Sequence, residues 1–229
     1  MAIKPILFNT EMVRAIMGGR KSCTRRLVKP QPDEKHAFPL GFVIDSTEKK
    51  KVGCFEFGIN EYGGSIQCAK PPYQPGDILY VRETWCGLPV NEAGHFRGHP
   101  IYYYRADGDL RPEGWRDAWH PSIHMPKEAA RIWLKVTDVR VERLQSITEE
   151  GAIREGAEGE KCHHTNVGAF GCTDCMNTGW IEPPQVEFMQ IWDSTIKKSD
   201  LDRYGWDANP YVFVIEFVKI DKPEEIQNA

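Results

Sequence analysis

The chain has 229 residues, of which 41% are hydrophobic and 27% are charged, and its formal net charge is -4. These values are ordinary for one large globular domain, or a smaller one with insertions, that buries a substantial core. The mildly acidic balance argues against a protein that coats duplex DNA, because non-specific binding needs a broad basic surface.

The N-terminal sequence MAIKPILFNTEM lacks the pattern of a signal peptide. The most apolar run, residues 211–215, is too short to cross a bilayer. Seven cysteines, an odd number, without a secretory signal indicate reduced thiols. We therefore expect a cytoplasmic protein with no membrane segment.

In the first third of the chain, Asn9 is a suitable cap for a helix that ends at Gly18-Gly19. Residues 30–75 are rich in proline, glycine and charge, and predict a loop with at most one short hairpin. The turn Pro75-Gly76-Asp77 then precedes the β-type run ILYVRETW.

Further along, residues 87–126 are too aromatic for a flexible linker and predict an ordered insertion. The segment RIWLKVTDVRVERL predicts a long strand that breaks near Thr137-Asp138. Ser146 and Glu149 form a capping-box pattern, which predicts a helix from Ile147 to Glu155 that stops at Gly156.

Near the C-terminus, Pro183-Pro184 predicts the start of a helix with Phe188 and Trp192 facing inward. The run YVFVIEFVKI is apolar on both faces, as in a central strand. Strands and helices do not alternate as βαβ units. The sequence therefore predicts an α+β domain built on a small, mostly antiparallel β-barrel with flanking helices.

The segment GGRKSCTRRLVKP concentrates cations in this acidic chain. It is not a Walker phosphate loop, because Arg20 separates the glycines from Lys21. A solvated charged face is one interpretation. A ligand pocket is the other, because the double glycine allows close approach and Thr24 follows Lys21 by three residues. A lysine whose pKa is lowered by burial and cationic neighbours can act as base for a hydroxyl nucleophile.

Four segments of the chain together resemble the ASCH domain, a relative of the RNA-binding PUA barrel. They are GRKSCTRR, PGDILYVRETW, RIWLKVTDVRVERL and SITEEGAIREG. The similarity is greatest to the large ASCH proteins of bacteriophages and prophages, which share segments like WHPSIHMPKEAARIWL and FMQIWDST…YGWDANPYVFVIEF. It covers nearly the whole chain. It implies one PUA-like domain over residues 1–229, with insertions at about 30–75, 87–126 and 157–183.

The resemblance also implies a function, which is binding of RNA or a modified nucleoside. One small bacterial branch of the family, the acetylcytidine amidohydrolases, removes the acyl group from the exocyclic amine of cytidine. Its catalytic lysine, threonine and glutamate fall by position on Lys21, Thr24 and Glu155. That branch lacks the three insertions, so the match implies a nucleotide-sized pocket more strongly than the same reaction. A non-catalytic RNA-binding module and a ribonuclease are the alternatives.

Several residues are candidates for substrate binding. Guanidinium groups suit phosphate or a base edge. A tryptophan at a strand end can stack on a base, although filling the core is the more common role of a lone strand tryptophan. Glu155, in the last turn of a predicted helix, suits a general acid/base, although a fraying surface glutamate is an equal alternative. The candidates for substrate binding are Arg20, Arg25, Arg26, Glu83, Trp85 and His124.

The loop EKCHHTNVGAFGCTDCMNTGW has the composition of a metal site. Cys172 and Cys175 have the C-x-x-C spacing that lets two thiolates bind one tetrahedral ion. With Cys162 and His164 they make a Cys3His set, typical of structural zinc; His164 is preferred to its neighbour His163. Four protein ligands leave no position for a catalytic water, and the H-x-E signature of zinc deaminases is absent.

Overall fold

The computed structural model describes residues 1–87, 102–111, 113, 118–164, 167–168 and 171–223. The chain divides into two compact units. Unit 1 comprises Met1–Gly19, Gly76–Val136 and Phe217–Ala229, and unit 2 comprises Arg20–Pro75 and Thr137–Glu216. The described part has several separate β-sheets and few α-helices, which confirms the α+β class. The single-domain organisation stays a prediction.

Unit 1 contains β1 (Ile3–Leu7), α1 (Thr10–Met17), β6 (Ile78–Arg82), β7 (Trp85–Gly87), β8 (Tyr102–Tyr104) and three short 3-10 helices, η2 (Arg105–Asp107), η3 (Ser122–His124) and η4 (Lys127–Ala129), among its described residues. Strand β1 is parallel to β6, and β6 is antiparallel to the start of β9 (Trp133–Arg143). A core cluster forms around Ile78, Met125 and Trp133. The predicted insertion at 87–126 lies partly outside the described residues.

Helix α1 begins and ends as its sequence predicts. The Asn9 side chain accepts a hydrogen bond from the backbone N–H of Met12 at 2.8 Å. Gly18 is the C-cap and Gly19, with φ of 74°, takes the left-handed conformation that glycine tolerates. The chain then enters unit 2 through the basic segment.

Unit 2 contains the remaining described elements, in chain order β2 (Cys23–Leu27), η1 (Glu34–His36), β3 (Phe38–Phe42), β4 (Phe55–Asn60), β5 (Gly63–Ala69), most of β9, η5 (Leu144–Ser146), α2 (Glu149–Glu155), β10 (Glu160–Lys161), β11 (Val167–Gly168), β12 (Gly171–Cys172), β13 (Trp180–Glu182), α3 (Pro184–Thr195), η6 (Lys198–Asp200), α4 (Leu201–Tyr204) and most of β14 (Tyr211–Ile220).

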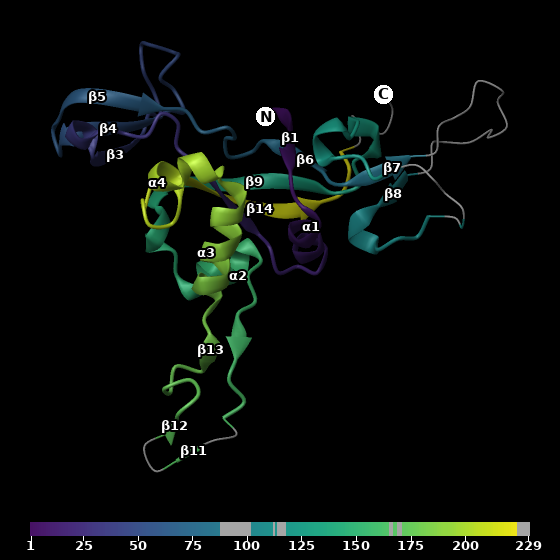
Figure 1. Cartoon of the computed structure of the whole chain (residues 1–229). Coiled ribbons are helices and arrows are strands. Elements are labelled where there is room, and N and C mark those ends of the chain that lie inside the picture. The colour runs from purple at the N-terminus through teal and green to yellow at the C-terminus, as the bar shows by residue number, and fades with distance from the viewer. Residues whose placement is uncertain (88–101, 112, 114–117, 165–166, 169–170, 224–229) are drawn as a thin grey trace, which may run out of the picture. The chain divides into compact units, whose positions relative to one another are not determined.

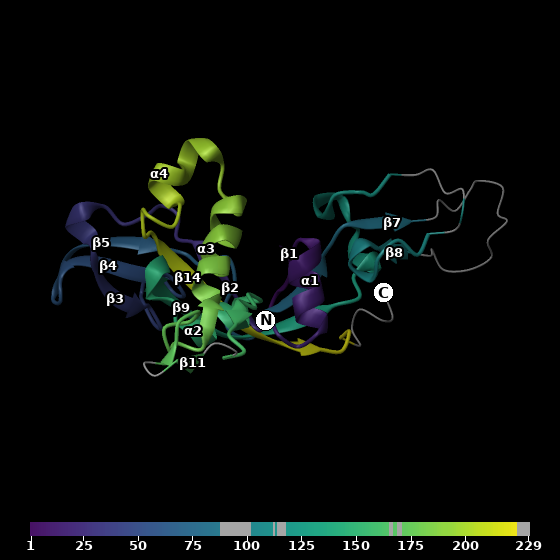
Figure 2. The same cartoon turned by 60° about the horizontal axis from the view of Figure 1, so that its bottom comes forward.

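The core of unit 2 lies between β14 and two helices. Strand β14 is antiparallel to β2, with Val212 opposite Leu27 and Val214 opposite Arg25. Helices α2 and α3 lie side by side (Figures 1 and 2), and their residues Ala152, Phe188 and Trp192 belong to the same buried cluster as Val212 and Val214. The intervening β14 residues are buried too, so the prediction of a strand buried on both faces is confirmed.

Residues 38–69 form a three-stranded antiparallel sheet, β3-β4-β5, so the prediction of a loop with at most one hairpin was wrong. Aromatic rings stabilise this sheet. Phe42, Phe55, Phe57 and Tyr211 form a chain of contacts with ring centroids 5.0 Å apart at each step. The proline, glycine and charge content of residues 30–75 concealed these strands, although Phe55, Phe57 and Ile59 alternate with Glu56, Gly58 and Asn60 along β4.

Two further predictions need correction. Strand β9 runs through Thr137 and Asp138 without a break, because both side chains are exposed and cost nothing to leave in water. Helix α2 is capped by Thr148, whose Oγ1 accepts from Gly151 N at 3.0 Å, whereas Ser146 ends a 3-10 turn. The predicted stop at Gly156 is confirmed, with φ of 104°.

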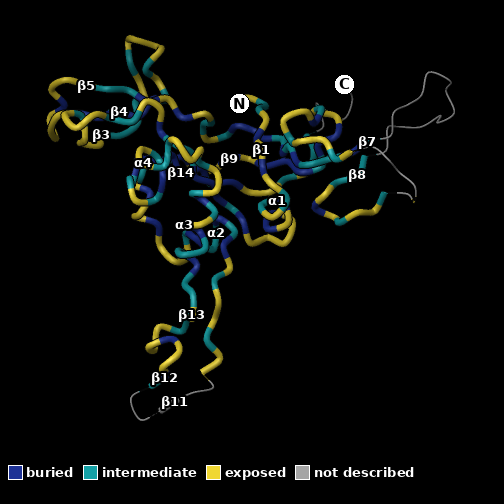
Figure 3. The backbone as a smooth tube through the Cα atoms, in the orientation of Figure 1, coloured by how far each residue is buried: buried dark blue, intermediate teal, exposed yellow. Residues whose placement is uncertain are grey.

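The described residues 157–164, 167–168 and 171–183 form an arm in which β10 pairs with β13 and β11 pairs with β12 (Figure 1). Most of its described backbone is exposed or half-buried (Figure 3), so apolar burial gives it little stability. Among the described residues, no helix has the length and apolar character to span a membrane.

Candidate functional site

Buried charges of unit 2 gather where β2 begins and α2 ends. The backbone N–H of Ser22 donates to the carbonyl of Arg154 at 2.9 Å, which joins the chain before β2 to the last turn of α2. Lys21 comes just before this contact, and Glu155 is the last residue of α2. The last carbonyls of a helix lack partners within the helix, so a cation placed here finds acceptors.

The Lys21 ammonium is surrounded by three oxygens. It donates to Glu155 Oε2 at 2.7 Å, to the Glu155 carbonyl at 2.7 Å and to the Cys23 carbonyl at 2.8 Å. These match its three hydrogens. The side chains of Lys21 and Glu155 are 0% and 5% exposed. Because a buried charge is tolerated only when it is paired, each of the two depends on the other.

Arg25 is the second cation on Glu155. Its Nη1 donates to Glu155 Oε1 at 3.2 Å and its Nη2 to Glu142 Oε2 at 3.3 Å. The guanidinium also lies 5.6 Å from the ring centroid of Phe188 in α3. We name Lys21, Arg25, Glu142 and Glu155 the Lys21 cluster.

The Lys21 cluster continues into a ring of ion pairs. Arg140 contacts Glu142 at 2.6 Å and Glu216, and Arg154 contacts Glu216 at 2.7 Å. Arg154 Nε donates to Ser22 Oγ at 3.1 Å, which closes the ring next to Lys21. Sequence reasoning missed Glu142 and Glu216. The alternation of Asp138, Arg140 and Glu142 along one strand was the available signal.

Thr24 and Arg26 contact each other. Arg26 Nη1 donates to Thr24 Oγ1 at 2.7 Å, and Thr24 is 1% exposed. Side chains alternate along a strand, so both lie on the face of β2 opposite that of Cys23 and Arg25. Burial lowers the pKa of Arg26, an effect that Glu155 opposes. The pKa of a guanidinium is normally so high that Arg26 stays charged at neutral pH, so a permanent cation donates to the Thr24 oxygen.

Cys23 shares the cluster's face of β2. Burial raises the pKa of its thiol to about 11, and the negative charge of Glu155 is the second contribution in the same direction. The thiol is 2% exposed. Cys23 is therefore a protonated packing residue at neutral pH and not a nucleophile.

The other predicted binding residues are distributed over both units. In unit 2, Arg20 pairs with Glu158 at 2.6 Å. In unit 1, Glu83 is 1% exposed and accepts hydrogen bonds from Arg131 at 2.9 and 3.1 Å. Burial raises the pKa of Glu83, and the hydrogen bonds and charge of Arg131 oppose this effect. Their binding role stays a prediction.

Trp85 and His124 also belong to unit 1. The Trp85 ring lies 5.8 Å from that of Tyr102 and 5.0 Å from that of His120. His124 is the exposed last residue of η3. Trp85 therefore takes part in aromatic packing, and its role as a stacking partner for a base stays a prediction.

The arm of unit 2 brings four side chains together as a group that can hold a metal ion. The ligand atoms of Cys162, His164, Cys172 and Cys175 all lie within 4.8 Å of one another. The Cys162 and Cys172 sulfurs are 3.5 Å apart, and Cys175 Sγ lies 3.7 Å from His164 Nδ1. This is the ligand set expected from the sequence, with His164 as the histidine that joins the cysteines. We name it the metal cluster.

Backbone turns direct these ligands inward. His164 and Asn177 have φ of 50° and 67°, in the left-handed region that histidine and asparagine adopt more readily than most residues. The His164 N–H donates to Cys162 Sγ at 3.4 Å. Two hydrogen bonds hold the pKa of Cys172 below its usual value. The larger effect comes from the backbone N–H of Cys175 and the next from the His164 ring. The site thus favours thiolate at Cys172, which is the form that binds metals.

Comparison of the chain with protein-family models, with curated proteins and with solved structures gives no match. A function for this chain therefore has to be inferred from its own residues.

Proposed function

We propose that the chain is an ASCH-type, PUA-like domain that binds RNA or a modified nucleoside beside β2, and that it hydrolyses the acylated exocyclic amine of cytidine. The observation that carries this proposal is the contact between Lys21 and Glu155. These residues are 134 positions apart and form a buried 2.7 Å ion pair. The family resemblance assigns catalytic roles to the same two positions.

The hydroxyl of Thr24 is the nucleophile in this proposal. The Arg26 guanidinium donates to its oxygen at 2.7 Å, which stabilises negative charge there. The Thr24 hydroxyl gives its proton to the Lys21–Glu155 pair as its oxygen bonds to the acyl carbon; the carbon–nitrogen bond then breaks and the leaving amine takes a proton back from this pair. Water then cleaves the acyl-threonine ester, which releases a carboxylic acid and restores the hydroxyl.

Binding without turnover is the second candidate, and the burial of these groups favours it. Thr24 is 1% exposed, and the Lys21 side chain is 0% exposed with three acceptors around its ammonium. Hydrolysis therefore requires a movement that uncovers Thr24 and also brings it to the Lys21–Glu155 pair, because Thr24 lies on the face of β2 opposite the Lys21 cluster. Binding requires no such movement, since the Arg20 side chain, on the segment that leads into β2, is 42% exposed and can reach a phosphate.

The two candidates differ in turnover. Wild-type protein is incubated with N4-acetylcytidine, and cytidine is followed by the change in ultraviolet absorbance and by chromatography. Thr24→Val should abolish turnover and Thr24→Ser should retain part of it, because serine keeps the hydroxyl. Glu158→Gln, which alters the exposed pair with Arg20, should behave as wild type.

Each outcome decides between the candidates. Binding of the nucleoside without release of cytidine refutes the hydrolase and leaves the binding module. Equal turnover by Thr24→Val and wild type refutes the role of Thr24. If neither N4-acetylcytidine nor single-stranded RNA binds, the whole proposal fails; cleavage of that RNA would indicate the ribonuclease instead.

We also propose that the metal cluster binds a structural zinc ion. Zinc–sulfur bonds of about 2.3 Å in a tetrahedron place two sulfurs about 3.8 Å apart, and a sulfur and a nitrogen about 3.6 Å apart. The observed separations of 3.5 and 3.7 Å are close to these values. Bound zinc would link the two sides of the arm, and its four protein ligands would leave no place for a reacting water.

A further inference from the structure

Unit 2 contains a serine, a histidine and an aspartate joined in series, outside the Lys21 cluster and the metal cluster. His36 Nδ1 lies 2.8 Å from Asp33 Oδ1, and His36 Nε2 lies 2.9 Å from Ser65 Oγ. Asp33 caps η1 and His36 ends it, whereas Ser65 lies in β5, 29 residues beyond His36. The contact with Ser65 is therefore made by the packing of η1 on the sheet. We name these three residues the Ser65 triad.

The direction of the two hydrogen bonds follows from the chemistry of the three groups. Hydrogen bonds from the His36 ring and then from its backbone N–H hold the pKa of Asp33 below its usual value. This carboxyl is therefore ionised at neutral pH and can only accept. In the neutral imidazole the hydrogen then sits on Nδ1, and Nε2 accepts from Ser65 Oγ. This is the arrangement in which a histidine can take the proton of a serine.

Further contacts fix the aspartate and the histidine. Asp33 Oδ1 also accepts from the backbone N–H groups of Lys35 and His36, each at 2.9 Å. The Asp33 N–H donates to the Gln67 side chain at 3.2 Å, which ties the aspartate to β5. The His36 side chain is only 17% exposed, although that of Asp33 is 62% exposed. The ring is thus held in one position beside Ser65, which is exposed to solvent.

The surface beside Ser65 can be approached closely. Gly63 and Gly64 precede it with φ of 91° and 64°, so no side chain covers the backbone there. The Ile59 side chain ends next to Gly64, because its Cδ1 lies 2.7 Å from the position that a Cβ of Gly64 would occupy. Ile59 is 49% exposed. An apolar group brought to Ser65 therefore finds an apolar contact beside it.

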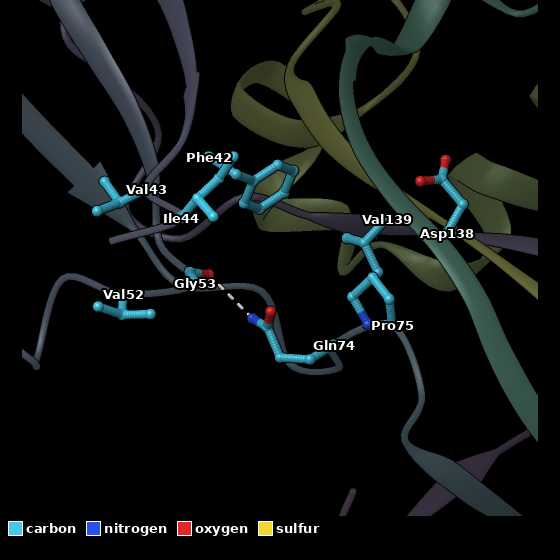
Figure 4. Close-up of a pocket in the computed structure, with 9 residues that line it drawn as sticks. All are labelled: Phe42, Val43, Ile44, Val52, Gly53, Gln74, Pro75, Asp138 and Val139. Carbon is cyan, nitrogen blue, oxygen red and sulfur yellow. Dashed lines mark hydrogen bonds between the residues drawn. The ribbon is translucent and has the colours of Figure 1, made fainter. Parts of the chain in front are cut away.

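The Ser65 triad lies apart from the cavity of unit 2. That cavity has a volume of about 390 Å³, and Figure 4 shows Phe42 on one side of it and Val139 on the other. Phe42 pairs with Phe55, which pairs in turn with Ala69 at the far end of β5 from Ser65. Ser65 is therefore at the opposite end of this sheet, where a substrate can reach it without entering the cavity.

We propose that the Ser65 triad is a second catalytic site, which hydrolyses esters of short carboxylic acids. Ser65 Oγ gives its proton to His36 Nε2 as it bonds to the acyl carbon, and Asp33 stabilises the positive charge on the ring. The bond to the alcohol oxygen then breaks, and the alcohol takes the proton from Nε2. Water next gives a proton to Nε2 as it attacks the acyl-serine, and Ser65 Oγ takes that proton back as the carboxylic acid leaves. The proposal is independent of the function proposed for the Lys21 cluster, because no residue is shared.

A fluorophosphonate probe tests the site directly, because it reacts with a serine that is activated by a base. An oxygen–phosphorus bond forms, and fluoride leaves with the serine proton. The full chain is incubated with the probe, and mass spectrometry of its peptides locates the label. Ser65 should react about a hundredfold faster than Ser199, the lower end of the usual effect of a positioned base. Ser199 is a matched internal control, because it is exposed and its Oγ lies 3.3 Å from the Asp200 carboxylate instead of a histidine.

Variants show which groups activate the serine. Ser65→Ala should lose hydrolysis of p-nitrophenyl acetate, and His36→Gln should slow both hydrolysis and labelling about a hundredfold. Asp33→Asn still caps η1, because asparagine caps as well as aspartate, but it should slow both rates about tenfold through loss of the charge. Ser199→Ala should behave as wild type. Thermal melts show whether each variant folds, and Asp33→Asn decides the matter if His36→Gln does not.

The length of the acyl chain tests the contact with Ile59. Relative to their rates with free imidazole, p-nitrophenyl butyrate should be hydrolysed about fourfold faster than the acetate, as expected for two CH₂ groups about half removed from water. Ile59→Ala should remove this preference and retain hydrolysis of the acetate.

Four results would overturn the proposal. One is the absence of label at Ser65 after long incubation with millimolar probe. A second is equal labelling of Ser65 in wild type and His36→Gln, which would make the histidine a structural partner only. A third is hydrolysis of p-nitrophenyl acetate by Ser65→Ala at the wild-type rate. The fourth is a label on Thr24 with none on Ser65, which would refute the Ser65 triad and support the function proposed for the Lys21 cluster.

Discussion

Replacement of Glu155 by glutamine measures how strongly the Lys21 cluster stabilises unit 2. Glutamine keeps the size of the side chain but removes its charge, which leaves Lys21 and Arg25 buried with side chains 0% and 2% exposed. Removal of one partner from a buried ion pair costs about 3–5 kcal/mol. Lys21 keeps two carbonyl acceptors, so we expect the lower end, about 3 kcal/mol.

That cost predicts a melting temperature lower by roughly 6–12 °C, since 1 kcal/mol shifts a protein of this size by about 2–4 °C. Circular dichroism and calorimetry give the melting temperature of unit 2. Glu158→Gln is the matched control, because Glu158 pairs with Arg20 at 2.6 Å while 64% exposed. Exposed pairs contribute about 0.2–1 kcal/mol, so this variant should melt within about 4 °C of wild type.

A double-mutant cycle with Lys21→Met isolates the pair. The loss in Glu155→Gln/Lys21→Met should be smaller than the sum of the two single losses, because contacting charges are coupled. Equal melting temperatures for Glu155→Gln and Glu158→Gln, or additive losses in the cycle, would refute the buried, mutually dependent pair.

Three other measurements test separate parts of the structure. Protein purified without added metal should contain about one zinc per chain, and Cys172→Ala should lose both the zinc and stability. Less than about a tenth of an equivalent of zinc in folded wild-type protein would contradict the zinc proposal. Thr148→Ala should cost about 1 kcal/mol and Ser146→Ala much less, because Thr148 caps α2; equal losses in urea titrations would show that the cap is misassigned. Folding raises the pKa of Cys23 from 9.0 to about 11, so the unfolded chain releases this proton at a lower pH than the folded chain. Between these two pH values, the free energy of unfolding of wild type should fall by up to about 1.4 kcal/mol for each unit that the pH rises. The same slope in Cys23→Ala would rule out this titration.

The sequence by itself determined the features that depend on neighbouring residues. Asn9 caps α1 and Gly156 ends α2, because caps act within one turn of the chain. The run 211–220 forms a buried strand because its apolar character is continuous. The spacing of Cys172 and Cys175 similarly predicted part of the metal cluster.

Tertiary structure decided which residues meet across long separations. Nothing local couples Arg25 to Glu142, or Arg154 to Glu216; β-strand register and the packing of α2 on β2 bring them together. The cavity lined by Phe42 and Val139 depends on segments about a hundred residues apart. Local propensity is set by each residue's own backbone and near neighbours, whereas a pocket or an ion-pair ring exists only after distant segments have packed.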